Sequence, residues 1–179
     1  MARDKPSEWI HPVHGFVASR RHLPHIELVD SYYFTTSVTK FRRELSPPDR
    51  DIVLLAIRFM DTKKYALDAV VVMPDHFHMI LRPLEKSSGG YYSLREIFHS
   101  IKSFTAHKIE GGVVWQDENF DHLIRNGEDY DEKLQYLIWN PVKSGLVNSP
   151  WDYTWLYWVG RVGPEEMGMV GPEAPTYAP

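Results

Sequence analysis

The chain has 179 residues, of which 43% are hydrophobic, and it contains no cysteine. This length predicts one domain, with appendages at most, and the missing cysteines exclude disulfides and thiolate metal sites. We expect a cytoplasmic protein, because residues 1–10 lack the apolar stretch of a signal peptide and no run reaches the ~18 apolar residues of a membrane span.

The net charge of -4 argues against a nucleic-acid-binding protein only if the charge is spread evenly, and it is not. Residues 163–179 contain three acidic residues and no basic one, so the rest of the chain has 20 basic and 21 acidic residues. Basic residues gather at Arg20 and Arg21 and on the segment that carries Lys102. Because local patches govern contact with phosphate, composition leaves DNA binding open.

The first half of the chain predicts a strand, a helix and two more strands. Three prolines break residues 1–29, which we expect to be an irregular N-terminal arm. Alternation predicts a strand at about 31–39, and Ser46–Pro47 is typical of the start of a helix, which runs to about Thr62. The valine-rich segment 65–73 and the run 76–82 predict strands on either side of a tight turn.

The second half predicts two helices and a strand between them. Ser93 and Glu96 match a capping box, and the helix after them should end at Gly111–Gly112. Its expected buried face is Leu94, Ile97, Phe98, Ile101 and Phe104. We expect a strand at 113–115, continued near 122–125, and a third helix from about Asp129 to Asn140, which Pro141 stops or kinks.

The predicted order is β-α-β-β-α-β followed by one more helix. This order is typical of the split βαβ, or ferredoxin-like, fold, in which an antiparallel sheet has helices on one face. We therefore predict an α+β domain at 30–158, with an extra C-terminal helix that carries Tyr136. It should lie between the arm 1–29 and a flexible Gly/Pro-rich tail at 159–179. The fold hosts many functions and does not by itself indicate this one.

The segment 73–81 carries the strongest chemical signal. Successive side chains of a strand point to opposite faces, so His76 and His78 share one face. Phe77 and Met79 share the other face and can enter a core. Paired imidazoles on a rigid strand can hold a metal ion that polarises a substrate, although such a pair, taken alone, is more often a hydrogen-bonded structural pair.

The third helix places a tyrosine and an amide together. Its predicted buried stripe is Leu134, Leu137 and Ile138. Tyr136 and Asn140 lie one turn apart on the face turned from that stripe. We expect His76 and His78 to hold a divalent cation, with Asn140 as a third ligand. The accessible Tyr136 oxygen would attack phosphorus, and Lys133 is a candidate to ease loss of the phenolic proton. In the alternative, Tyr136 is a surface residue and Asn140 caps a turn.

The combination resembles a known family. The matching segments lie in family order over roughly residues 20–155, at 20–25, 72–78, 102–105, 115–116, 121–125 and 136–147. They resemble the REP-associated branch of the single-tyrosine transposases of small bacterial insertion sequences, whose genes lie beside repeated extragenic palindromes (REPs). His76–Phe77–His78 is similar to the histidine–hydrophobic–histidine motif of that family.

The resemblance implies an enzyme that cuts and rejoins single-stranded DNA at hairpins with Mg²⁺ or Mn²⁺, through a covalent 5′-phosphotyrosine. It assigns the nucleophile to Tyr136 and metal ligation to His76, His78 and Asn140. Related transposases share active sites across a dimer, so self-association stays open. We expect DNA phosphate contacts from six basic residues: Arg20, Arg21, Lys102, Arg125, Lys133 and Lys143.

The sequence departs from the family pattern at two positions, and two other functions stay open. Asp75 stands where the family has asparagine, which adds charge beside the expected metal site, and Phe120 replaces a tyrosine. One alternative is a domesticated protein that binds palindrome hairpins without cutting them. The other is an unrelated hydrolase with zinc on the two histidines, because imidazole ligands favour zinc over magnesium.

Overall fold

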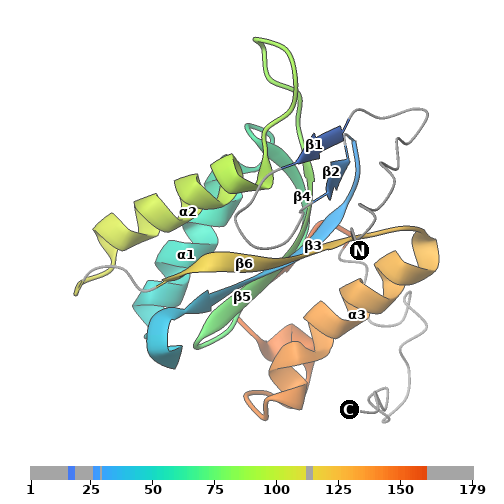
Figure 1. Ribbon diagram of the computed structural model, residues 1–179. Helices are drawn as coiled ribbons and strands as arrows, with labels where there is room; N and C mark the ends of the chain where they lie inside the picture. The colour runs from blue at the N-terminus through green and yellow to red at the C-terminus, as the bar shows by residue number, and fades with distance from the viewer. Residues whose placement is uncertain (1–15, 19–25, 29, 112–114, 161–179) are drawn as a thin grey trace, which may run out of the picture.

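The computed structural model describes residues 16–18, 26–28, 30–111 and 115–160 (Figure 1). Across these residues the protein is an α+β fold with three α-helices and a five-stranded antiparallel sheet, as predicted. In spatial order the strands of this sheet are β6 (Trp115–Leu123), β3 (Tyr33–Thr39), β5 (His76–Pro83), β4 (Tyr65–Val72) and β7 (Leu156–Trp158). The helices are α1 (Pro47–Met60), α2 (Leu94–Lys108) and α3 (Gly127–Lys143).

The chain order β3-α1-β4-β5-α2-β6 places β5 between β3 and β4, antiparallel to both. Helices α1 and α2 lie on one face of the sheet and share a hydrophobic core with it (Figure 1). The extra helix α3 covers the opposite face, with a second core of its own. The sheet is therefore enclosed from both sides, and each face has a different set of neighbours.

Strand β5 supplies side chains to both faces. Phe77, Met79 and Leu81 are fully buried in the core beneath α1 and α2. Ile80 packs in the core beneath α3, on the same face as His78. The predicted alternation is therefore confirmed. Each large apolar side chain buried in this way contributes roughly 1.5–3 kcal/mol to folding, so the strand is rigidly anchored.

Both helices of the larger core begin at a capping box. Ser46 of α1 and Ser93 of α2 each accept a hydrogen bond from the backbone N–H three residues on, and the acidic side chain there bonds back to the cap. The predicted buried face of α2 is confirmed except at Phe104, which is 40% exposed. Thr105 is buried instead, because its hydroxyl accepts a hydrogen bond from the Trp115 indole at 2.8 Å.

Helix α3 is longer than the sequence predicted. It starts after Asn126, whose side chain accepts a backbone N–H in the first turn, and it runs through Pro141 to Lys143. Of the two predicted effects of Pro141, a stop or a kink, the stop is wrong. Proline removes one N–H donor, but in the last turn this costs a single intrahelical bond. The carbonyl groups of Asn140 and Pro141 still accept hydrogen bonds from residues just beyond the helix.

Short and edge strands account for the other departures. The segment 1–29 was expected to be irregular, yet β1 (Phe16–Ala18) and β2 (Ile26–Leu28) pair antiparallel within it. Strand β6 is continuous over nine residues, where two pieces were predicted, and residues 113 and 114 lie outside the described residues. Strand β7 was not predicted, because three residues are too few to show a period.

The predicted tail begins at residue 159, and from 161 onward it lies outside the described residues. Among the helices that the structure describes, none combines the length and the apolar character needed to cross a membrane.

Candidate active site

The two histidines of β5 lie side by side beneath α3. Their ring centroids are 4.6 Å apart, and His78 is 4% exposed. The register of β3 against β5 sets Thr36 opposite His78, and the Thr36 Oγ1 atom is 2.7 Å from the His78 Nδ1 atom. The pair that the strand pattern placed on one face is therefore held there by a neighbouring strand.

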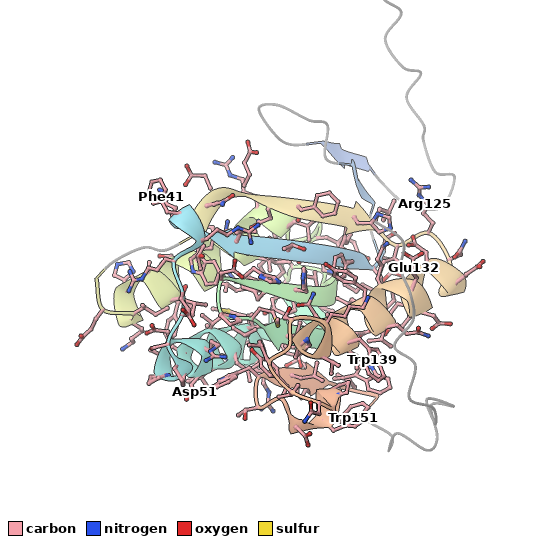
Figure 2. All side chains as sticks on the ribbon, turned by 90° about the horizontal axis from the view of Figure 1, so that it is seen from below. Phe41, Asp51, Arg125, Glu132, Trp139 and Trp151 are labelled. Atoms are coloured by element: carbon pink, nitrogen blue, oxygen red, sulfur yellow. The ribbon has the colours of Figure 1, made fainter. Side chains whose placement is uncertain are left out.

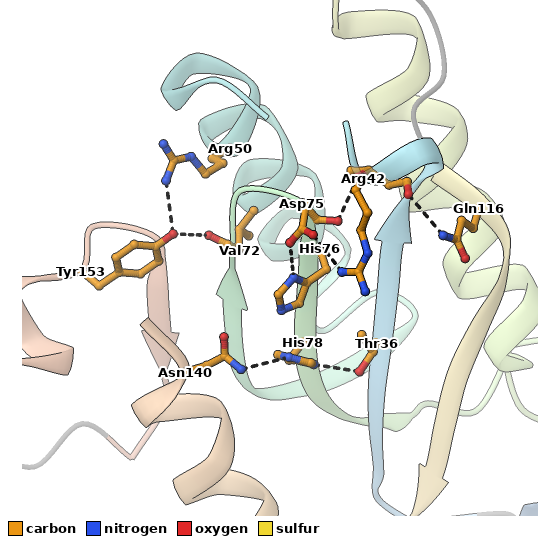
Figure 3. Close-up of polar contacts among 11 residues, drawn as sticks. Thr36, Arg42, Arg50, Val72, Asp75, His76, His78, Gln116, Asn140 and Tyr153 are labelled. Carbon is orange, nitrogen blue, oxygen red and sulfur yellow. Dashed lines mark hydrogen bonds and ion pairs between the residues drawn. The ribbon is translucent and has the colours of Figure 1, made fainter. Parts of the chain in front are cut away.

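The protonation of His78 follows from its surroundings. Burial lowers the pKa of His78 to about 3, and the neighbouring His76 acts in the same direction. The ring is therefore neutral near pH 7. The Asn140 amide donates to the His78 Nε2 atom over 3.3 Å, so Nδ1 carries the hydrogen and donates to Thr36 (Figure 3). A neutral imidazole with its lone pair on Nε2 is the form that binds metal ions.

Tyr136 extends from α3 and lies next to His78. Its ring centroid is 5.3 Å from that of His78 and 5.8 Å from that of Phe34, which stacks on His78. Tyr136 is 37% exposed, so the residue is not enclosed in the core. The Lys143 ammonium lies 5.5 Å from the Tyr136 ring centre. One chain thus brings together a phenol, two imidazoles and a cation.

Asn140 corrects one prediction. It was expected on the face of α3 turned from the core, but it is 7% exposed and points at His78. The reason is that α3 rests on β4 and β5, so the sheet covers the helix edge that carries Asn140. Its Oδ1 atom is buried, and no described group donates a hydrogen bond to it. An unpaired buried acceptor costs about 1–3 kcal/mol, so this oxygen has a lone pair to offer to water or to a ligand.

The chemistry of these residues fits a divalent cation. His78 is neutral, and the His76 Nδ1 atom is 2.6 Å from the Asp75 carboxylate, which leaves the His76 Nε2 atom for a ligand. The Asn140 NH2 group lies against the His78 Nε2 atom, so the amide would have to turn over for its oxygen and that nitrogen to bind one cation. The described residues contain no group of three His, Cys, Asp or Glu side chains that could hold a metal ion. Ligation by Asn140 therefore stays a prediction, and its amide oxygen is a third candidate ligand beside the two imidazoles.

The six predicted phosphate contacts are not gathered in one place by the described residues. Arg20 and Arg21 lie outside those residues. Lys102 donates its ammonium hydrogens to the backbone carbonyl groups of Gln116 and Asp117 at 2.6 and 3.3 Å. Lys102 therefore links α2 to β6, a role that the sequence did not indicate.

The other three basic residues belong to α3 and its ends. Arg125 is exposed at the end of the molecule where β6 gives way to α3 (Figure 2). Lys133, the predicted aid to deprotonation of the phenol, forms an ion pair with Glu132 at 2.9 Å. Lys143 at the other end of α3 is the cation that lies over the Tyr136 ring.

Sequence reasoning missed Thr36 and the contact between Asp75 and His76. Thr36 is 42 residues from His78 along the chain, and only the register of β3 brings the two together. Asp75 was noted for its charge, but its bond to His76 depends on the geometry of the turn between β4 and β5. The one available signal was alternation, which puts Thr36 and Phe34 on the same face of β3.

No family model matches the sequence. The chain is 30% identical to the REP-associated tyrosine transposase of Escherichia coli K12 over 127 residues, which are 69% of this chain and 74% of that protein. A Haemophilus influenzae protein with the same family description is 27% identical over 98 residues, 48% of this chain and 56% of the relative. A solved structure of a REP-associated tyrosine transposase bound to a REP hairpin superposes with a TM-score of 0.65 at 24% identity. That superposition covers 78% of this chain and 82% of the other, and it supports the fold.

Proposed function

The chain belongs to the family of REP-associated tyrosine transposases, and from this premise we propose that it nicks and rejoins single-stranded DNA at palindromic hairpins. The proposed reaction depends on Mg²⁺ or Mn²⁺ and passes through a covalent 5′-phosphotyrosine on Tyr136. The observation that carries the proposal is the convergence of Tyr136 on the histidine pair, with ring centroids 5.3 Å apart for Tyr136 and His78.

The proposed chemistry is an in-line displacement at phosphorus. The Tyr136 oxygen forms a bond to phosphorus while the bond from phosphorus to the 3′ oxygen breaks. The phenolic proton leaves, and the 3′ oxygen takes up a proton to become a hydroxyl group. Rejoining is the reverse step, in which a 3′ hydroxyl group attacks the phosphotyrosine and releases the phenol. Both steps conserve the number of phosphodiester bonds and need no external energy source.

Each residue of the site has a role in this proposal. His76, His78 and Asn140 would hold the divalent cation, which when bound supplies Lewis-acid polarisation of the phosphate. Lys143 places positive charge beside the phenol, where negative charge develops as the proton leaves. Because Tyr136 and His78 come from one chain, the geometry favours attack within a single protomer.

DNA would approach α3 from its exposed side. Arg125, Lys133 and Lys143 lie along or beside this helix, and we propose that they contact phosphates and set the position of the strand. A protein that binds hairpins without cleaving them would not need Tyr136 to lie against the pair His76 and His78. The unpaired Asn140 oxygen beside the histidines also favours an active cation site over a structural histidine pair.

The proposal is tested with the full-length protein and an end-labelled DNA hairpin that carries single-stranded flanks. With Mn²⁺, we expect a covalent protein–DNA adduct on a denaturing gel, and none with EDTA. Tyr136→Phe should lose the adduct. The matched control is Tyr130→Phe on the same helix, whose hydroxyl bonds Asp68 at 2.8 Å, and it should keep the adduct.

Three results would separate the alternatives. An adduct that survives Tyr136→Phe contradicts the assignment of the nucleophile. Hairpin binding that survives loss of both histidines, with no adduct under any metal, supports a binding protein. Cleavage without any adduct, by protein that purifies with zinc, supports a zinc hydrolase.

A further inference from the structure

Asp75 is the departure from the family pattern that lies beside the site. It ends the turn between β4 and β5, and its Oδ1 atom is 2.6 Å from the His76 Nδ1 atom (Figure 3). A carboxylate can only accept, so His76 donates from Nδ1 and keeps its lone pair on Nε2. An asparagine in this place could accept the same hydrogen bond, but it would bring no negative charge to the site.

The charge of Asp75 is balanced by an arginine from another part of the chain. The Arg42 Nη1 atom donates to the second Asp75 oxygen, Oδ2, at 2.8 Å. The other oxygen, Oδ1, accepts from His76, so one cationic and one neutral donor face the carboxylate. Both carboxylate oxygens are therefore occupied, and Asp75 is an ion at neutral pH.

Arg42 reaches Asp75 through an unusual backbone. Phe41 and Arg42 both have φ of 54°, in the left-handed region that ordinary residues seldom adopt. The short helical turn Lys40–Arg42 that contains them is fastened to the β4–β5 turn, because Thr39 donates from its backbone and its side chain to the Asp75 carbonyl at 2.9 Å. The strained turn thus projects Arg42 toward the residue next to the histidine pair.

This ion pair adds little to stability. The Arg42 side chain is 69% exposed, and exposed ion pairs contribute little because water screens them. A strained backbone whose contacts contribute little to stability is typical of functional positions. The group that the pair can influence is His76, which Asp75 contacts directly.

We propose that Asp75 and Arg42 are positioning residues that set the affinity of the histidine pair for a divalent cation. Asp75 fixes His76 with Nε2 free and adds negative charge beside the cation, and Arg42 offsets part of that charge. This inference rests on the proposed function for the cation site. It predicts effects of opposite sign, because removal of Asp75 weakens cation binding while removal of Arg42 strengthens it.

The test measures binding of Mn²⁺ to the full-length protein without DNA, by electron paramagnetic resonance of the free ion. Asp75→Asn should weaken binding about tenfold, because it removes the negative charge beside the cation site and weakens the hydrogen bond that holds the ligand His76. Arg42→Gln should tighten it about threefold, since an unbalanced carboxylate attracts the cation. In the double variant, the Arg42 effect should vanish. Arg43→Gln is the matched control and should change nothing, because Arg43 in the same turn donates to the Glu110 carbonyl at 2.8 Å instead.

A second measurement does not involve metal or DNA. Long-range ¹H–¹⁵N spectra of the metal-free protein should show His76 with hydrogen on Nδ1, and Asp75→Ala should mix the two tautomers. A wild-type His76 with hydrogen on Nε2 would overturn the inference. So would a loss of Mn²⁺ affinity in both single variants, or no change in either.

These outcomes are separate from the test of the proposed function. If the variants shift Mn²⁺ binding in opposite directions but no DNA adduct forms, the inference stands and the proposed function fails. If the adduct forms and the two variants do not differ in sign, the inference fails and the proposed function stands. Absence of Mn²⁺ binding that depends on His76 and His78 would overturn the inference as well.

Discussion

The two faces of the sheet have opposite properties, although the same strand supplies both. On the α1 and α2 face, β5 presents Phe77, Met79 and Leu81, which are fully buried. On the α3 face it presents His76 and His78, next to a half-open phenol and an amide oxygen that has no described donor. The first face is closed and apolar, whereas the second face combines a smaller apolar core, which includes Ile80 of the same strand, with these polar groups. The apolar packing of the first face holds β5 rigidly and so fixes the position of the histidines on the second face.

Substitution of both histidines should give the largest effect on activity. His76→Ala with His78→Ala removes two of the three proposed cation ligands, so we expect adduct formation to fall on the order of 10²-fold or more. The circular dichroism spectrum should stay that of the folded protein, because the larger core is untouched. Adduct formation within twofold of the wild type would show that the α3 face is structural.

A substitution on the opposite face of the same strand should affect folding instead. Phe77 is fully buried and lies edge-on to Trp115, with ring centroids 5.1 Å apart. Phe77→Ala should lower the free energy of unfolding by about 3–5 kcal/mol, because it leaves a cavity in the core. Denaturant unfolding measures this value. A loss below about 1 kcal/mol would contradict the view that this face anchors the strand.

The two lysines of α3 test which cation assists the Tyr136 phenol on the α3 face. Lys143→Gln should slow adduct formation roughly tenfold, because its ammonium lies 5.5 Å from the Tyr136 ring centre. Lys133→Gln is the matched control on the same helix and should have a smaller effect, because Lys133 is paired with Glu132. Single-turnover rates with a hairpin oligonucleotide distinguish the two. The reverse order would restore Lys133 as the residue that assists the phenol.

The smallest effect is expected at the cap of α2, on the closed side. Hydrogen bonds from Lys86 and Ser93 lower the pKa of Glu96 from 4.5 to about 2. A lowered carboxylate pKa stabilises the folded state above pH 4.5, and this stabilisation is lost as the pH falls toward 2. Because the side chain is nearly half exposed, Glu96→Gln should cost only about 0.5 kcal/mol at pH 7. In thermal unfolding, the stability difference between the wild type and Glu96→Gln should shrink as the pH falls. A difference that does not change with pH would contradict the assigned hydrogen bonds.

The sequence predicted the elements that have a clear period and the residues within them. The alternation at 76–81, the N-cap at Ser46, the capping box at Ser93 and the buried stripe of α3 depend on local spacing, and all are present. Strand β7 and the pair β1 and β2 are too short to show a period. Phe104 and Asn140 were misplaced, because the edge of a helical face is decided by what packs against it.

The sequence predicted only part of the candidate site, because local spacing does not show tertiary contacts. His76, His78 and Tyr136 stand out as residue types in a pattern, and the resemblance linked them. Thr36 and Arg42 join the site through strand register and a left-handed turn, which no local spacing reveals. Contacts between residues 33 or 42 positions apart belong to the tertiary structure, and the sequence alone did not show them.

The central claim is that the Tyr136 oxygen becomes bonded to DNA phosphate. It is tested most directly by trapping the Mn²⁺ reaction with a hairpin oligonucleotide, digesting the protein and DNA, and locating the modified peptide by mass spectrometry. The account predicts a nucleotide linked through its 5′ phosphate to Tyr136. A nucleotide on any other side chain, or cut DNA with no modified peptide, would contradict it.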